Sequence, residues 1–281
     1  MACEPPTQRD QPLSRYSLAD LTQVLAQEPT VGPLTRSMVW RILDRDALRP
    51  WRYRLWIFPR DPAFAEKAGR VLDLYAGEWA GGPLGPDDYV LSADEKTSIQ
   101  ARARCHPGRP PRPGYAQQIE FEYERRGAVQ YLAAWDVRRA QVFGRCEAQT
   151  GIVPFGRLVA QVMSQEPYRS AARVFWLVDN GSSHRGAAAV HRLQGAYPNL
   201  ILVHLPLHAS WLNQIEIYFS IIQRKVLTPN DFPTVTAVAD RLRAFEQRMN
   251  AAPRPFAWQF TRADLESRLR EEDPTPLPVA S

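Results

Sequence analysis

The chain has 281 residues, of which 44% are hydrophobic and 23% are charged, enough for one large domain or for a small module joined to a medium one. This apolar share, with 10% aromatic residues, excludes a wholly disordered chain. Apolar stretches are far shorter than the roughly 20 residues that a bilayer needs, and the N-terminus has no secretory signal pattern. We therefore expect a cytoplasmic protein without membrane association.

Cysteine usage and net charge say little about partners. Cys3, Cys105 and Cys146 are an odd number at wide spacing, which indicates reduced thiols rather than a disulfide framework or a structural zinc site. The 35 basic and 30 acidic side chains leave a net charge of +5 and a pI near 9.3. This excess weakly favours a polyanionic partner. Only three of the 35 basic residues are lysine, and arginine suits phosphate and guanine edges, although a base composition that favours arginine codons is the simpler explanation of this preference.

Two helices are predicted near the N-terminus, where the basic excess is concentrated. Apolar residues from Leu18 to Leu25 follow Ser17, a plausible N-cap, at helical spacing, and the pattern stops at Pro29. After a turn, a second pattern opens at Thr35 and has an apolar side of Met38, Val39, Ile42 and Leu43.

This helix-turn-helix pattern has a basic second half. Residues 36–60 contain seven arginines and only two aspartates, as expected where a recognition helix meets DNA. An ordinary helical hairpin with a solvated basic face is the alternative. The side chains expected to contact DNA are Arg36, Ser37, Arg41, Arg45, Arg49 and Arg52.

The rest of the chain predicts alternating strands and helices. Residues 59–86 have the character of a connector, with one helix over 63–75. A strand then ends on Asp94, a basic irregular loop covers 102–114, and an antiparallel meander with tight turns at 126–127 and 138–139 follows. Beyond it we expect helices over 155–163, 184–193 and from 212 toward 226, with buried strands over 172–179 and 199–205.

This order of elements predicts an α/β fold, a mixed sheet covered by helices on both faces. We expect four regions: a helix-turn-helix module (1–58), a linker (59–86), a catalytic domain (87–250), and a C-terminal helix with a flexible tail (251–281).

Three carboxylates stand at the edges of these predicted elements. Asp94 and Asp179 each end a strand, and Glu216 lies one position off the apolar stripe of the last long helix. If the two strands are neighbours, the acids converge and repel one another, which raises their pKa values unless cations neutralise them. Oxygen ligands without clustered cysteine or histidine select Mg²⁺ or Mn²⁺. Two such ions about 4 Å apart suit an in-line phosphoryl displacement.

Each acid alone has a simpler explanation. Asp179 fits a turn that ends a strand, Glu216 fits an ion pair with Arg224, and Glu95 is a rival ligand that strand alternation points to the other face. Three polar residues nearby are expected to support the acids: Asn180, His184 and Asn213. For His184, a histidine whose hydrogen bonds are satisfied within a loop is the simpler interpretation.

Long strings of the sequence resemble the DDE transposases of bacterial insertion sequences in the mariner superfamily. Their three catalytic blocks resemble SADEKTSIQA, FWLVDNGSSH and LPLHASWLNQIEIYFSIIQRKVL. The family's linking segments resemble HPGRPPRPG and YERRGAVQYLAAWDV, and its second DNA-binding unit and linker resemble the basic helix-turn-helix with RLWIFPRDP. The 36 residues between Asp179 and Glu216 fall within the narrow spacing typical of this superfamily.

The resemblance places the family's three catalytic and metal-binding acids on Asp94, Asp179 and Glu216. It implies a ribonuclease-H-like fold, Mg²⁺ or Mn²⁺, with two ions expected, and cut-and-paste DNA transfer. Water cleaves at the element ends, and the freed 3′ hydroxyl attacks target DNA, usually at TA. The implied partners are double-stranded DNA, as inverted-repeat ends and as target, and a second copy of the chain on DNA. In a bacterium the DNA-bound protein would lie at the nucleoid.

One departure from the family concerns the N-terminus. Family members usually begin with another helix-turn-helix, whereas about sixteen residues precede the first one here. A truncated reading frame is one explanation, and it impairs recognition of the inverted repeats while leaving the catalytic domain intact. The alternative function is therefore a non-catalytic DNA-binding repressor derived from a transposase. A nuclease acting on RNA in hybrids is disfavoured, because the basic module fits a B-form major groove.

Overall fold

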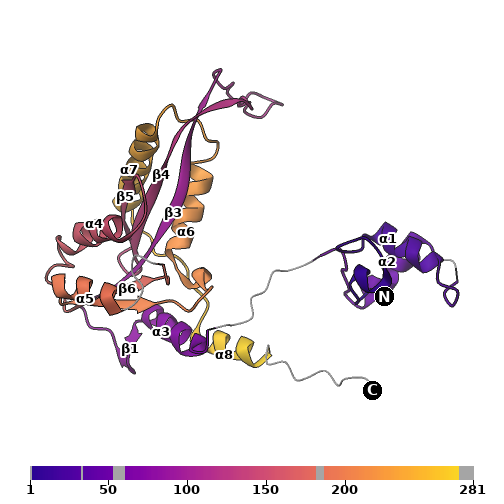
Figure 1. Cartoon of the computed structure of the whole chain (residues 1–281), viewed down its shortest axis with the longest axis horizontal. Coiled ribbons are helices and arrows are strands. Elements are labelled where there is room, and N and C mark those ends of the chain that lie inside the picture. Colours follow the sequence, from indigo (N-terminus) through magenta and orange to yellow (C-terminus); the bar gives the residue numbers. More distant parts are fainter. Residues whose placement is uncertain (1, 33, 53–60, 182–186, 272–281) are drawn as a thin grey trace. The chain divides into compact units, whose positions relative to one another are not determined.

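The computed structural model describes residues 2–32, 34–52, 61–181 and 187–271, and it divides into two compact units (Figure 1). Unit 1 covers Met1–Phe58 and unit 2 covers Pro59–Ser281. Within the described ranges, no helix combines the length and the apolar character that crossing a membrane requires.

Unit 1 is built from a short 3-10 helix, η1 (Pro6–Arg9), and two α-helices, α1 (Leu18–Ala26) and α2 (Arg36–Arg45). The side chain of Ser17 accepts a hydrogen bond from the backbone N–H of Asp20, whose carboxylate accepts one from the N–H of Ser17. Thr35 caps α2 through a single bond, which its side chain accepts from the N–H of Met38. The predicted cap at Ser17 is therefore present, and the two caps fix where the helices begin.

The apolar side of α2 is narrower than its sequence pattern indicates. Val39 and Leu43 are buried with Tyr16 and Leu21. Met38 and Ile42, which we predicted on the same side, are 39% and 45% exposed. The prediction was wrong for this pair because α2 packs mainly on α1 and buries one row of residues at i and i+4.

Unit 2 contains seven strands and six α-helices among its described residues. In chain order these are α3 (Phe64–Ala76), β1 (Glu78–Trp79), β2 (Gly82–Pro83), β3 (Asp88–Arg104), β4 (Tyr123–Asp136), β5 (Gln141–Glu147), α4 (Ile152–Met163), β6 (Arg173–Val178), α5 (Ala187–Ala196), β7 (Leu200–His204), the 3-10 turn η2 (Ser210–Leu212), α6 (Ile215–Lys225), α7 (Val235–Ala251) and α8 (Arg262–Glu271). The main sheet has the order β5-β4-β3-β6-β7.

The main sheet is mixed, as predicted. Strands β3, β4 and β5 form an antiparallel meander, whereas β3, β6 and β7 run parallel. Alternate residues of β6 enter different cores: Trp176 packs in the cluster that contains α4, and Phe175 packs in the cluster that contains α3. A third cluster places α6 and α7 against Trp135 of β4. Helices thus cover both faces of the sheet, which confirms the predicted fold class.

The long hairpin of β3 and β4 differs from the prediction. We expected a strand to end at Asp94 and a turn at 126–127, but β3 continues to Arg104 and β4 runs unbroken through Gly127. The two strands pair from Leu91↔Asp136 out to Arg104↔Tyr123. Mutual pairing satisfies the backbone, and Gly127, with φ of 96°, sits at a register shift as a bulge instead of a turn.

We call the outer part of this hairpin, residues 96–129 with its connecting loop, the arm. Figure 1 shows β3 and β4 extending together beyond the other strands, with α6 and α7 beside them.

Two helices that lie outside the segment 87–250, α3 and α8, also pack against the main sheet. Helix α3 lies in the segment that we expected as a linker, and its Val71 and Leu72 are buried with Phe175 of β6. Helix α8 contributes Leu265 to the same core. The start of the helix that we predicted at residue 184 lies outside the described residues, and its described part is α5.

Candidate active site

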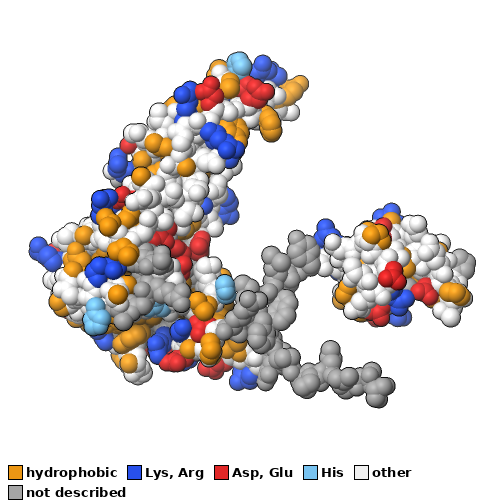
Figure 2. All heavy atoms as spheres, in the orientation of Figure 1, with side chains coloured by type: hydrophobic (Ala, Val, Ile, Leu, Met, Phe, Trp, Pro, Cys, Tyr) orange, Lys and Arg blue, Asp and Glu red, His pale blue; other side chains and the backbone are white. Residues whose placement is uncertain are grey.

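The three acids occupy elements that meet at one end of the parallel strands. Strands β3 and β6 pair from Asp88↔Arg173 to Ser92↔Leu177. Asp94 follows two residues later on β3, and Asp179 directly follows β6. Carboxyl ends of adjacent parallel strands are where α/β sheets place ligand sites. Figure 2 shows Asp and Glu side chains gathered at the base of the arm.

Glu216 reaches this region because a buried hydrogen-bond network fixes the start of α6 to β3. The Asn213 amide donates to the backbone oxygen of Ala93 at 3.0 Å and to the Asp94 carboxylate at 3.4 Å. Ser92 donates its hydroxyl hydrogen to the Asn213 side-chain oxygen and accepts the Ile215 N–H at 3.0 Å. Asn213, which precedes Glu216 by three positions, therefore also orients Asp94.

A tyrosine from α3 supports the same turn from the other side. The Tyr75 hydroxyl donates to the Leu212 carbonyl at 2.7 Å and accepts the Gln214 N–H at 3.2 Å. Burial raises the pKa of Tyr75 far above its ordinary value, so this hydroxyl stays protonated and keeps donating. The segment that leads into α6 is thus held on two sides.

Burial makes it costly for the acids to carry negative charge. Burial raises the pKa of Asp94 to about 7, and repulsion from Asp179, Glu95 and Glu216 adds to this, although the Glu95 N–H opposes it at 2.7 Å. Burial also raises the pKa of Glu216, and the positive charge of Lys96 partly opposes the rise. A cation bound between these carboxylates would remove the cost.

The donor chemistry of the three acids fits a hard divalent cation. Carboxylate oxygens are the ligands that Mg²⁺ and Mn²⁺ prefer. Within the described ranges, no three His, Cys, Asp or Glu side chains already stand close enough together to hold an ion. The structure therefore shows that Asp179 and Glu216 influence Asp94 electrostatically.

The residues around the acids take several roles. Asp179 accepts the Gly181 N–H at 2.7 Å, so the turn that we considered as its simpler explanation is also present. The Asn180 amide donates to the Leu205 carbonyl at 2.7 Å and ties the end of β6 to the residue after β7. Arg224, the alternative partner of Glu216, donates to the Ser220 carbonyl instead. His184 lies outside the described residues.

Sequence analysis missed three residues at this site: Ser92, Tyr75 and Lys96. Ser92 carries a usable signal, because a hydroxyl in the middle of an apolar strand requires a buried partner. Lys96 lies two residues after Asp94 on the same strand. A basic residue so close to a candidate acid indicates that its positive charge offsets part of the negative charge of the site. Tyr75 has no such signal, since its partners lie more than a hundred residues away along the chain.

The arginines predicted to contact DNA lie on unit 1. Side chains of Arg36, Ser37, Arg41, Arg45 and Arg52 are exposed. Arg49 is half-buried and forms an ion pair with Asp44 at 2.6 Å, so part of its charge is already balanced. Arg45 also lies 3.5 Å from Asp46, but both side chains are largely exposed. Four exposed arginines therefore remain as the basic surface of α2 and the segment after it.

Comparison with known proteins places the chain in a family. Residues 89–239 match the model of the DDE superfamily endonucleases, a region that includes all three acids. No curated protein matches the chain. Among solved structures, the Mos1 mariner paired end complex with Mn is 16% identical, with 85% of this chain and 73% of that chain covered and a TM-score of 0.52.

Two further Mos1 structures are similar. The Mos1 strand transfer complex is 14% identical over 87% of this chain and 73% of that chain, with a TM-score of 0.49. The Mos1 paired-end complex with left transposon end is 13% identical over 87% and 74%, with a TM-score of 0.49. At such identities the likeness concerns the fold. The chain thus belongs to the DDE superfamily endonucleases, and its fold is that of a mariner-type transposase.

Proposed function

We propose that the protein is a transposase that cuts DNA at the ends of an insertion sequence and joins those ends to target DNA. The observation that carries this proposal is the Ser92–Asn213 network. It holds Asp94 and the start of α6 together at the strand ends where Asp179 emerges. The family match and the fold shared with a transposase support the same assignment.

Asp94, Asp179 and Glu216 would hold divalent Mg²⁺ or Mn²⁺, with two ions as the natural number for this chemistry. When bound, the ions lower the cost of the attacking oxygen's negative charge and stabilise the leaving oxygen. Asn213 holds the Asp94 carboxylate in place through its amide. Asn180 fixes the backbone that carries Asp179. The protein's contribution is therefore positioning and charge neutralisation.

One acidic site serves both steps of the reaction. Cleavage is an attack of water on a phosphodiester at the element end, and strand transfer is an attack of the resulting 3′ hydroxyl on target DNA, with TA as the expected target. Both reactions displace an oxygen at phosphorus, so the same carboxylates serve each in turn. His184 remains a proposed supporting residue near Asp179.

Unit 1 would supply duplex DNA binding. Its exposed arginines, Arg36, Arg41, Arg45 and Arg52, present a basic surface with Ser37 on and after α2, and Arg49 adds a partly balanced charge. Such a helix fits the major groove, where arginine contacts phosphates and guanine edges. Two element ends have to be brought together for cut-and-paste transfer, so we propose a homodimer on DNA, located in a bacterium at the nucleoid.

The direct test is a cleavage assay with purified full-length protein, Mg²⁺ or Mn²⁺, and duplex DNA that carries the inverted repeats flanking the gene. We expect metal-dependent nicks at the repeat ends, followed by joining to a target plasmid. Binding without any nicking would reject the enzymatic proposal for this chain and support a non-catalytic repressor. Cleavage confined to an RNA–DNA heteroduplex would instead identify a hybrid nuclease.

A further inference from the structure

A continuous groove leads away from the candidate active site between α6 and β3. It consists of three adjoining hollows of about 350, 220 and 470 Å³. The first contains Glu216 and Lys96, the second shares Lys96 with it, and Gln223 lines all three. The third ends at Phe121 in the loop of the arm. The groove therefore connects an acid of the site to the tip region of the arm.

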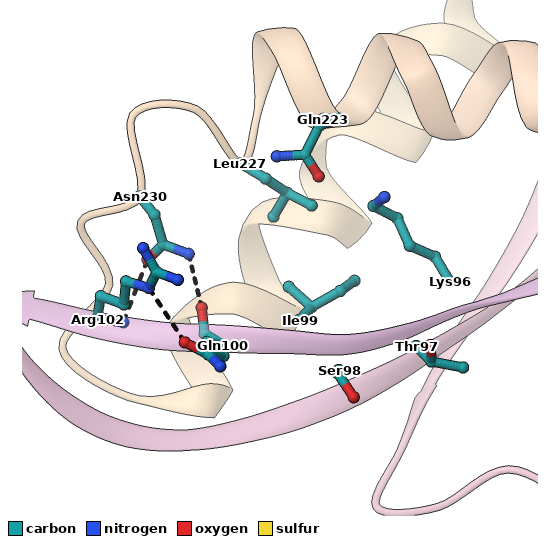
Figure 3. A pocket seen from close by; sticks show the side chains of 9 residues that line it. All are labelled: Lys96, Thr97, Ser98, Ile99, Gln100, Arg102, Gln223, Leu227 and Asn230. Atoms are coloured by element: carbon teal, nitrogen blue, oxygen red, sulfur yellow. Dashed lines mark hydrogen bonds between the residues drawn. The ribbon is translucent and has the colours of Figure 1, made fainter. Parts of the chain in front are cut away.

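Two apolar side chains line the middle hollow among polar neighbours. Figure 3 shows Ile99 below Leu227, with Lys96 to their right and Arg102 to their left. At the far end of this view, Asn230 donates to the Gln100 carbonyl at 2.7 Å and accepts the Arg102 N–H at 3.2 Å. These bonds fix the wall of the groove without occupying its interior.

Four basic side chains and two acidic ones, Glu216 and Glu120, line the groove, and the hydrogen bonds of three of the cations go to neutral groups. Arg102 donates to the neutral Gln100 side chain, Arg104 donates to backbone carbonyls of residues 120, 121 and 230, and Arg224 donates to the Ser220 carbonyl. Lys96 adds a fourth cation at the end near the site. Glu216 offsets part of the Lys96 charge and Glu120 part of the Arg104 charge. The remaining excess of basic side chains attracts an extended polyanion.

The end of the groove presents an aromatic ring to solvent. Phe121 is 91% exposed, although a phenylalanine in a folded protein is usually buried. A basic groove combined with an exposed aromatic side chain is the arrangement that binds single-stranded nucleic acid: cations follow the phosphates, and the ring stacks on a base.

The length of the groove matches a short oligonucleotide. Residues 96 to 104 of β3 span about 25 Å at about 3.3 Å per residue. At about 3.4 Å per stacked nucleotide, this distance corresponds to roughly seven nucleotides of one strand.

We propose that this groove binds a single DNA strand that continues from the reacting phosphate along α6 and β3 to Phe121. The inference rests on the proposed function, because that function supplies the strand. The inference goes beyond the proposed function because it assigns side chains to parts of the strand. Phe121 is assigned to a base, and four basic residues are assigned to phosphates: Lys96, Arg102, Arg104 and Arg224. Duplex recognition by unit 1 is a separate activity, with separate residues.

The test measures strand binding without cleavage. Full-length protein carrying Asp179→Asn is titrated with fluorescein-labelled single strands of 4, 8 and 12 nucleotides of mixed sequence in Mg²⁺. We expect affinity to rise from 4 to 8 nucleotides and to change little from 8 to 12. Adding Arg102→Gln and Arg224→Gln should weaken binding of the 8-mer about tenfold and lower its salt slope by about 1.4, since each single-strand phosphate contact contributes about 0.7.

Two more variants separate the groove from general charge and from misfolding. Arg243→Gln removes an exposed arginine of α7, paired with Asp240 and outside the groove, and should leave strand binding unchanged. Phe121→Ala should weaken the 8-mer by at least about fivefold, because base stacking is lost. Arg224→Gln alone changes an exposed side chain and serves as the test if the double variant does not fold.

The outcomes distinguish this inference from the proposed function. If the wild-type chain fails to cleave any DNA but its strand binding depends on Arg102, Arg224 and Phe121, the transposase proposal fails and the groove assignment stands. If the chain cleaves DNA and binds the 8-mer equally well with and without these side chains, the groove assignment is wrong.

Discussion

Unit 1 and unit 2 use charge in opposite ways. Unit 1 has a small core around Tyr16, Leu21, Val39 and Leu43, and exposed arginines gather on the surface of α2. Unit 2 has three apolar clusters around a five-stranded sheet, and its important charges are carboxylates that burial makes costly. Exposed cations attract DNA over a distance that depends on the salt concentration, whereas the effect of a buried acid depends on its exact position. We therefore expect substitutions of the acids in unit 2 to lower activity more than substitutions of the arginines in unit 1.

The largest effect is expected at Asp179. Replacing it with Asn keeps the size of the side chain but removes one of three charges proposed to hold the divalent ions, so DNA cleavage should fall by at least about a thousandfold. Duplex binding, assigned to unit 1, should stay nearly unchanged in a gel-shift titration. Asp240→Asn, at an exposed position on α7, is the matched control and should cleave normally. Cleavage that survives in Asp179→Asn would count against the assignment of the acids.

The next effect concerns the network that positions the acids. Asn213→Ala removes the amide between Ala93, Asp94 and Ser92, and should lower cleavage by about 10- to 100-fold, the usual cost of losing a group that orients metal ligands. The measurement is the single-turnover rate as a function of Mg²⁺ concentration, which should also shift to weaker apparent metal affinity.

Asn250→Ala is the control for this variant. The Asn250 amide bonds both the N–H and the carbonyl of Val142 on β5, so it has a comparable structural role far along the sheet from the acids. It should lower stability without changing the metal dependence of cleavage. An equal shift of metal dependence in both variants would show that Asn213 acts on stability alone.

A smaller effect links the acids to stability. The folded-state pKa of Asp94 is raised from 3.8 to about 7, so the folded protein binds more protons than the unfolded chain between about pH 4 and 7. Without metal, stability therefore falls as the pH rises through this range. Asp94→Asn should be more stable than wild type at pH 8, by about 1 kcal/mol or more, and the gain should vanish near pH 4.

Thermal melts with and without Mg²⁺ check this expectation. Mg²⁺ should stabilise wild type at pH 8 but not Asp94→Asn, because the added ion offsets the repulsion. Glu246, whose pKa burial raises to about 7, provides the comparison: Glu246→Gln should show the same pH trend without any change in its response to Mg²⁺. A Mg²⁺ response that is identical in wild type and Asp94→Asn would place the metal elsewhere.

The smallest effect is expected in unit 1. Arg41→Ala or Arg45→Ala should weaken duplex binding by about three- to tenfold and lower the salt slope by about 0.9, the contribution of one phosphate contact. Arg49→Ala should do less, since Arg49 is half-buried and pairs with Asp44 at 2.6 Å, whereas the exposed Arg45 lies 3.5 Å from Asp46. Cleavage of a pre-bound DNA end should not change. An unaltered salt slope in both variants would show that another surface binds the duplex.

Local patterns in the sequence predicted a large part of this structure. The cap at Ser17 bonds a backbone group three residues away, and such short-range geometry is visible in the sequence itself. Apolar runs and the periodic spacing of apolar residues predicted the buried strand that leads to Asp179, the order of elements and the mixed sheet. The three acids were singled out as candidates because a charged residue at the end of an apolar element needs an explanation.

Tertiary structure decided the rest. The exposure of Met38 and Ile42, the continuation of β3 to Arg104 and the bulge at Gly127 all depend on what each element packs against or pairs with. The bond between Ser92 and Asn213 joins residues 121 positions apart, and a groove forms only once α6 lies along β3. Side-chain period reports which face of an element is apolar, but the partner of that face, and the hydrogen bonds made across it, are determined when distant segments pack together.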